Sequence, residues 1–155
     1  MAIGRGKIAE ALKYQNAFTS ECISVSAATV YYNGNAITDN SGIMIDTQDF
    51  DEINFVINPG TVLGTLATIQ NTVYDSATDD PTAAALVTGA SFTDVNSSND
   101  DAIQEGSILC KNAKRYMCLR TEVLGTLITI DFSAIAALGK VDGEAVSKTL
   151  TFDVI

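Results

Sequence analysis

The feature that most constrains the fold is an alternation of apolar and polar residues over the segment "TLITIDFSAIAAL", residues 126–138. Every even position from 128 to 138 is apolar, whereas the odd positions include Thr129, Asp131 and Ser133. Side chains of a β-strand point alternately to opposite faces of the sheet. A period of two over this length therefore predicts a strand with one buried face and is hard to reconcile with a helix.

Most of the chain after residue 20 has the same character. In residues 52–57, Ile53, Phe55 and Ile57 alternate with Glu52, Asn54 and Val56, and a stop is expected at Pro59-Gly60. Asn33-Gly34 predicts a tight hairpin turn. Over residues 114–123 both faces are mixed, so the pattern does not say which side is buried. Further strands are expected within residues 20–27, 65–74, 91–96, 105–110 and 148–155. About eight strands, most of them with one face exposed to solvent, predict an all-β fold: an antiparallel β-sandwich of jelly-roll type.

Two segments depart from the strand pattern. Residues 1–14 carry Ile8, Ala11 and Leu12 at helical spacing, which predicts a short N-terminal helix or arm that must pack on something to be stable. In residues 79–89, Asp80 before Pro81 favours one capped helical turn, and a loop is equally compatible. We expect residues 15–155 to form a single domain without an internal repeat.

The residue types needed for common catalytic mechanisms are scarce. The chain has no histidine, which removes the commonest general base and the commonest zinc ligand. It has no G-x-S-x-G nucleophile turn and no Gly-rich phosphate loop before a helix. We therefore expect no enzymatic activity, no catalytic residue and no cofactor.

Two acidic groups are candidates for a calcium site, which needs several oxygen ligands converging from a bent loop. Neither group has the spacing of an EF-hand loop, so we expect solvated charges that discourage sheet-edge aggregation and no bound metal. The groups are Asp46, Asp49, Asp51 and Glu52, and Asp75, Asp79 and Asp80.

The three cysteines, Cys22, Cys110 and Cys118, are an odd number without metal-ligand spacing. That count predicts reduced thiols in a reducing compartment.

The charge balance and the length of the longest apolar run exclude two classes of partner, nucleic acid and membrane. Nine basic residues against nineteen acidic ones give a net charge of −10, which does not supply the cationic surface that nucleic acid requires. The longest apolar run, residues 134–138, is too short to span a membrane, and the N-terminus lacks the apolar stretch of a signal peptide.

Seven of the nine basic residues fall into two short groups. Arg5, Lys7 and Lys13 lie near the start, four more lie in "KNAKRYMCLR", residues 111–120, and none lies between Lys13 and Lys111. The second group either balances the chain's own acidic strands or forms a docking face for an acidic partner. The residues alone do not distinguish these two hypotheses.

The order of segments from Met44 onward resembles a group of tailed-bacteriophage head proteins, the small β-sandwich decoration or cement proteins. The resemblance rests on order and spacing over roughly residues 43–140, and "ALKYQNAF" near the N-terminus fits as well. The matching segments are "IDTQDFDEINFVINPGTV", "ATIQNTVYDSATDD", "SFTDVN", "KNAKRYMCLRTEV" and "AIAALG". The segment "ISVSAATVYYNGNAITDNSG" and the strand expected at residues 147–155 depart from the group's pattern.

The resemblance implies a structural virion protein on the outer surface of a phage head, assembled in the cytoplasm of the bacterial host. Its partner would be the major capsid protein, whose subunits it would bridge as a homotrimer or, alternatively, a dimer. Lys114, Arg115 and Tyr116 match the group's basic-aromatic strand, which implies that Arg115 braces an acidic loop such as 46–51.

These expectations divide the cations into two sets. Lys114, Arg115 and Arg120 are expected to form a structural charge cluster, and the arm with Arg5, Lys7 and Lys13 is expected to contact the capsid. The rival hypothesis is a carbohydrate- or receptor-binding module of a phage fibre or head spike. Such a module needs an exposed aromatic cluster, whereas the five Tyr and six Phe here fall largely at inward strand positions.

Overall fold

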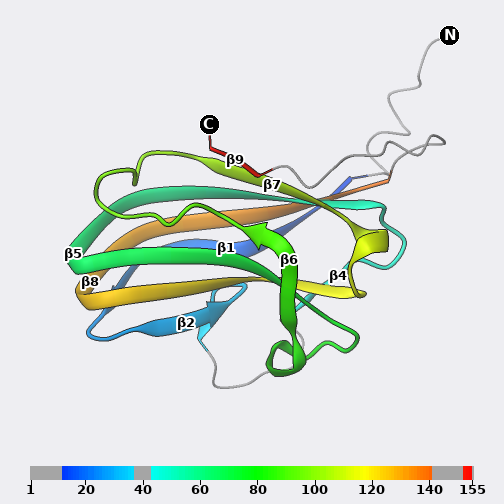
Figure 1. Cartoon of the computed structure of the whole chain (residues 1–155), viewed down its shortest axis with the longest axis horizontal. Coiled ribbons are helices and arrows are strands. Elements are labelled where there is room, and N and C mark those ends of the chain that lie inside the picture. The colour runs from blue at the N-terminus through cyan, green and yellow to red at the C-terminus, as the bar shows by residue number, and fades with distance from the viewer. Residues whose placement is uncertain (1–11, 37–42, 141–151, 155) are drawn as a thin grey trace, which may run out of the picture.

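The computed structural model describes residues 12–36, 43–140 and 152–154, and these form one antiparallel sheet that curls into two layers (Figure 1). The predicted all-β class is confirmed, and no α-helix occurs in the described part of the chain. The jelly-roll connection stays a prediction. The strands are β1 (Leu12–Val25), β2 (Thr29–Tyr32), β3 (Asn35–Ala36), β4 (Ile45–Asp46), β5 (Glu52–Ser76), β6 (Ala85–Ser91), β7 (Gln104–Leu109), β8 (Tyr116–Gly139) and β9 (Phe152–Val154). Two single 3-10 turns are also present, η1 (Pro81–Ala83) and η2 (Cys110–Asn112).

A long ribbon of two strands, β5 and β8, forms the centre of the molecule. The strands are 25 and 24 residues long and pair antiparallel from Glu52↔Gly139 to Ser76↔Tyr116. At the pair Thr65↔Thr126 the ribbon turns back on itself, so each strand contributes one half to each layer (Figure 1). We call residues 63–68 and 124–127 the bend, and the opposite end, where both strands begin and finish, the open end.

The remaining strands extend the two layers on either side of the ribbon. In the first layer the order is β1, residues 128–139 of β8, residues 52–57 of β5, β7 and β9. In the second layer β2 and β4 pair with residues 120–123 and 116–117 of β8, along the edge that faces away from β5. β3 pairs with β2, and β6 pairs with the last residues of β5.

The core lies between the layers and is built by the alternation read from the sequence. All six even positions from Ile128 to Leu138 are buried, as are Ile53, Phe55 and Ile57. The second layer adds Ile69, Val73, Leu119 and Val123. Burying each large apolar side chain stabilises the fold by about 1.5–3 kcal/mol.

The structure also shows which side of the segment 114–123, whose two faces are both mixed in the sequence, is buried. Met117, Leu119, Thr121 and Val123 face the core, whereas Arg120 and Glu122 lie partly exposed on the outside.

The predicted stop at Pro59-Gly60 is wrong, because β5 continues through both residues. Pro59 pairs with Phe132 of β8, and its other neighbour, β7, pairs only as far as Ile57. A register shift follows directly, between Pro59 and Val62. A proline is tolerated in a strand beside such an irregularity and where no second ladder needs its missing N–H group.

Three local predictions have clear outcomes. The Asn33-Gly34 hairpin is confirmed: the residues join β2 to β3 with φ values of 45° and 80°, the left-handed geometry of the favoured two-residue turn. Asp80 caps a single turn, η1, since its Oδ1 accepts a hydrogen bond from the N–H of Thr82 at 2.9 Å. Most of the strand expected at residues 91–96 is absent, and only Ser91 and an isolated bridge at Val95 pair with β5.

The expected N-terminal helix or arm over residues 1–14 needs correction at its end. Residues 12–14 are the start of β1 and pair with residues 137–139 of β8. Tertiary pairing along a whole neighbouring strand outweighs the weak helical spacing of three apolar residues. Residues 1–11, including Arg5 and Lys7, lie outside the described residues.

The expectation of no internal repeat is wrong at the bend. Residues 62–69 read "VLGTLATI" and residues 123–130 read "VLGTLITI", so seven of eight positions are identical. The two copies pair with each other about Thr65↔Thr126, which gives the bend a local pseudo-two-fold axis. The register keeps this equivalence: Val62 pairs with Ile130, Ile69 with Val123, Leu63 with Thr129 and Thr68 with Leu124.

Candidate functional site

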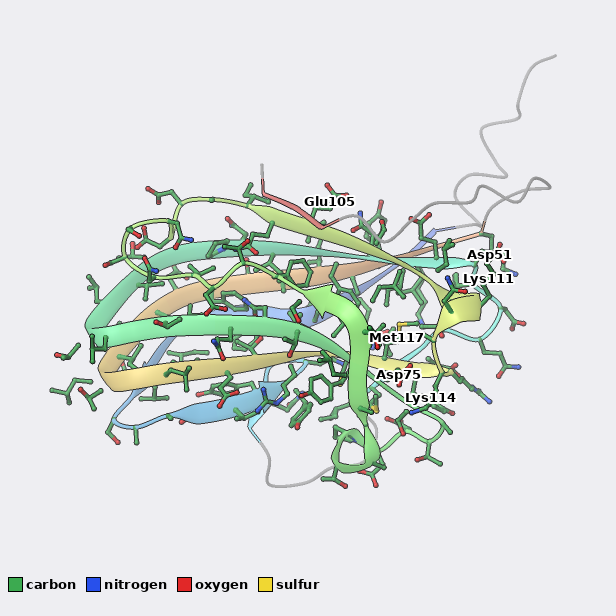
Figure 2. The ribbon with its side chains drawn as sticks, in the orientation of Figure 1. Asp51, Asp75, Glu105, Lys111, Lys114 and Met117 are labelled. Atoms are coloured by element: carbon green, nitrogen blue, oxygen red, sulfur yellow. The ribbon has the colours of Figure 1, made fainter. Side chains whose placement is uncertain are left out.

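The basic stretch at residues 111–120 begins at the open end and continues into β8. It passes through η2 and a short loop before β8 begins at Tyr116. Figure 2 shows Lys111 and Lys114 at the end away from the bend, with Lys114 close to Asp75. Two carboxylates of other strands meet it there: Asp46 on β4, which pairs with Tyr116, and Asp75 near the end of β5.

Arg115 and Asp46 form a two-pronged ion pair. Arg115 Nε donates to Asp46 Oδ1 at 2.9 Å, and Nη2 donates to Oδ2 at 2.7 Å. The backbone reinforces this contact, because the N–H and hydroxyl of Thr47 donate to the Arg115 carbonyl at 2.9 and 2.6 Å. The guanidinium also lies 5.0 Å from the centroid of the Tyr116 ring. Arg115 therefore holds the loop that begins at Asp46 against the start of β8.

The electrostatic effect of this pair is strong although the pair is on the surface. Hydrogen bonding to Arg115, with smaller contributions from the Gln48 amide and the charge of Lys13, lowers the pKa of Asp46 to about 2. The same pair raises the pKa of the Arg115 guanidinium. Both side chains stay open to water, with exposed fractions of 47% for Arg115 and 40% for Asp46.

Lys114 makes a second contact of the same kind with Asp75. Its Nζ lies 3.2 Å from Asp75 Oδ1, and its backbone N–H donates to Oδ2 at 3.0 Å. The Asp75 side chain is only 13% exposed, so the lysine neutralises a largely enclosed carboxylate.

Arg120 lies apart from the other two cations, in the part of β8 that belongs to the second layer, on the outer face of that layer. Its Nη1 donates to Glu122 Oε2 at 2.7 Å, and its guanidinium lies 5.6 Å from the Tyr74 ring, which packs edge-on against Tyr32. All three residues of the expected charge cluster thus pair with carboxylates of this chain, but the structure places them in two locations.

Only one residue of the expected contact arm is described. Lys13 lies exposed near the start of β1, opposite Leu138 at the open end. Arg5 and Lys7 fall outside the described residues. The arm consequently joins the sandwich at the same end as Lys114 and Arg115.

The acidic groups considered for calcium are engaged by the chain's own donors. Asp46 also accepts the Gln48 N–H at 2.9 Å, Asp79 accepts the Met44 N–H at 3.0 Å, and Asp80 caps η1. In the described part of the chain no three acidic, cysteine or histidine side chains converge as metal ligands would.

Two of the three cysteines are described, and both are free thiols. Burial raises the pKa of Cys110 to about 11 and that of Cys118 to about 12. The side chain of Cys22 lies outside the description. Thiols with such pKa values stay protonated at neutral pH and are poor nucleophiles.

A shallow hollow of about 220 Å³ lies at the junction of β5, β6 and β7. No aromatic ring lines it, and its one carboxylate is Asp75, already bound by Lys114. Such a lining lacks the stacking surface that a sugar-binding site uses. The lining residues are Asp75, Leu86, Val87, Thr88, Ile108, Leu109 and Asn112.

A second surface, at the bend, was not anticipated. Leu63, Leu66 and Leu127 have exposed fractions of 57%, 88% and 78%, and we call these three side chains the leucine tip. Leu66 and Leu127 occupy equivalent places in the two copies of the repeat. The repeated "VLGTL" was the signal in the sequence that could have identified it.

Comparison of the chain with protein-family models, curated proteins and solved structures found no match. No helix in the described residues is long and apolar enough to cross a membrane.

Proposed function

We propose that this protein decorates a phage head and stabilises it by bridging subunits of the major capsid protein. It would act on the outer surface of the virion after assembly in the cytoplasm of the bacterial host. The proposal assigns no catalytic residue, metal or cofactor to the chain. Copies would associate as a homotrimer at local three-fold positions, with a dimer on two-fold positions as the alternative.

One observation carries the proposal: a single sandwich presents two chemically different surfaces at opposite ends. The open end holds the charged residues Lys13, Lys114 and Arg115 and the attachment point of the basic arm, whereas the bend holds the leucine tip. The strand segment 52–62 between them spans about 35 Å at 3.3 Å per residue. A body of this length with a contact at each end is suited to cross a subunit boundary.

The energetics of a head favour such a clamp. Packed DNA pushes the shell outward, and contacts across subunit boundaries oppose its expansion. Each small protein buries only a limited area, but two attachment points on one body raise the effective affinity without any new contact.

The experiment that tests the proposal first asks whether a neighbouring gene encodes a major capsid protein, and then uses heads assembled from that protein. Purified full-length chain is mixed with these heads, which are then sedimented and heated in a calorimeter. We expect saturable co-sedimentation and a higher disruption temperature for decorated heads. Absence of co-sedimentation at a tenfold molar excess would refute the proposal.

The rival function, binding of a carbohydrate or a receptor, has less support in the described residues. Among the described residues, Tyr14, at 66% exposed, is the only aromatic side chain in the set of large exposed apolar ones. Binding to a panel of immobilised glycans, with no binding to heads, would favour the rival.

A further inference from the structure

The leucine tip is held outward by an unusual backbone. Leu66 and Leu127 have φ values of 54° and 51°, in the left-handed region that L-residues other than Gly, Asn and Asp rarely occupy. Each follows the glycine of its own repeat by two residues. The two glycines allow the backbones of β5 and β8 to cross closely. A Cβ on Gly125 would lie 2.8 Å from the Thr65 carbonyl oxygen, and one on Gly64 would lie 3.0 Å from that of Leu127.

The fold itself does not account for leucine at these two positions. The left-handed conformation costs roughly 1–2 kcal/mol for an ordinary L-residue, and asparagine or glycine would adopt it more cheaply. Burial does not repay that cost, since the two side chains are 88% and 78% exposed. Because the same choice occurs in both copies of the repeat, we look for its reason outside the chain.

The charges near the bend identify the chemistry of the occupant. Asp100 lies beside the bend, since its Oδ2 accepts the N–H of Val62, the residue that precedes the bend, at 2.9 Å. The exposed Asp131 lies on β8 four residues after the end of the bend. Of the basic side chains in the described part of the chain, Arg120 is paired with Glu122 and the others are at the open end. The tip is therefore an apolar centre with an acidic border.

We propose that the leucine tip docks into an apolar socket bordered by basic side chains on a partner protein. The inference rests on the proposed function, and the partner is then the major capsid protein. Removing the exposed leucines from water would supply binding free energy, and the acidic border would supply orientation and speed of association.

Two other occupants are disfavoured by the same charges. A second copy placed tip to tip would bring two acidic borders together, which is repulsive. An anionic lipid surface attracts basic segments and repels acidic ones. Three leucines also cover far less than the roughly 800 Å² per partner that a stable dimer buries.

The local pseudo-two-fold axis leads to a specific expectation for the head binding of single variants. Leu66 and Leu127 are related by that axis and are exposed to a similar extent. We expect the single variants Leu66→Asn and Leu127→Asn to weaken head binding about equally, by roughly tenfold or more each. The double variant should lose about the product of the two factors, if the sites are independent.

Asparagine is chosen because it tolerates the left-handed conformation, so the melting temperature of both variants should stay at or above the wild-type value. Leu86→Thr on β6, at an unrelated exposed leucine, is the matched control and should bind as the wild type does. The charge reversal Asp131→Lys should slow association, and raising the salt concentration should reduce the difference from wild type.

The decisive outcome is head binding by the folded double variant. If wild-type protein binds heads and Leu66→Asn/Leu127→Asn binds equally well, the leucine tip is not the docking surface. If wild-type protein does not bind heads at all, the proposed function fails instead. Binding of wild-type protein to phosphatidylcholine vesicles that the double variant loses would show a lipid-inserting tip and overturn the socket.

Discussion

At the scale of single residues, the Arg115–Asp46 pair illustrates how exposure limits what a well-formed ion pair contributes. The two hydrogen bonds have the two-pronged geometry that is strongest for arginine and carboxylate. A large loss of stability on removing Arg115 would require a substantially buried pair. With 47% and 40% of the side chains exposed, solvent screens the interaction and the contribution is smaller.

We predict that Asp46→Asn lowers the melting temperature by a few degrees at most near pH 7, and that the difference from wild type shrinks as the pH falls below 4. The pKa of Asp46 is about 2 in the folded protein, below the value of about 3.9 for an unfolded aspartate. The pair therefore contributes stability above about pH 4, and the contribution is lost as the pH falls towards 2. Thermal melts of both proteins at pH 7, 4 and 2.5 measure it; a constant difference across this range would contradict the prediction.

At the scale of secondary-structure elements, strands as long as β5 and β8 can pack their inward faces together only because the ribbon bends. A flat ribbon of this length could not bring its inward faces together. Paired glycines with φ values of 137° and 116° let the backbones cross at the bend, and the two layers then pack on each other. The ring centroid of Phe18 on β1 lies 4.9 Å from that of Phe132 on β8 and 5.6 Å from that of Tyr31 on β2. These aromatic contacts join the first layer to the second.

We predict that Gly125→Ala lowers the free energy of unfolding by about 3 kcal/mol, because it adds both backbone strain and a steric clash. Its Cβ would lie 2.8 Å from the Thr65 carbonyl oxygen. Gly89→Ala is the matched control: its φ is also positive, at 78°, but its Cβ would meet no atom within 4 Å. The control should lose about 1 kcal/mol. Urea unfolding curves compare the two, and equal losses would show that the crossing at the bend is not tight.

At the scale of the whole molecule, the two ends are separate in chemistry and can be tested separately. The open end carries Lys13 and the attachment point of the basic arm, and the bend carries the leucine tip. The start of β1 at Leu12 sets where a truncation must stop.

We predict that deleting residues 1–11 weakens head binding strongly and leaves the melting temperature within a few degrees of wild type. The deletion removes Arg5 and Lys7 but keeps β1, which pairs with β8 from Leu12 onward. Arg5→Gln/Lys7→Gln in the full chain is the control for charge alone and should lose part of the binding. Wild-type affinity of the truncated protein for heads would mean that the arm is not a capsid contact.

We also predict that a chelator leaves the melting temperature unchanged within error. Asp46, Asp79 and Asp80 accept hydrogen bonds from the protein's own backbone, so they need no ion to neutralise or organise them. A structural ion at 100 times its dissociation constant would contribute about 2.7 kcal/mol. Calorimetry with and without EDTA measures this, and a drop of roughly ten degrees would reveal a bound cation.

The sequence by itself determined the class of the fold and most of its inward faces. Alternation at Ile128–Leu138 and at Ile53–Ile57 is a local property, because side-chain direction in a strand has period two whatever the neighbouring strand is. The turn at Asn33-Gly34 and the cap at Asp80 are equally local, since backbone conformation and one side chain suffice for each. These predictions needed no partner strand.

Only the tertiary structure decided which strands continue and which residues meet. Pro59 looked like a stop, but it lies where β7 no longer pairs with β5, which depends on a strand far along the chain. Residues 12–14 were expected to belong to a helix or arm because of the spacing of Ile8, Ala11 and Leu12, but pairing with β8 makes them a strand. The partners of Lys114 and Arg115 depend on β4 and β5 reaching the start of β8. Long-range pairing satisfies whole rows of backbone hydrogen bonds at once, and that outweighs the small local preferences by which single segments are read.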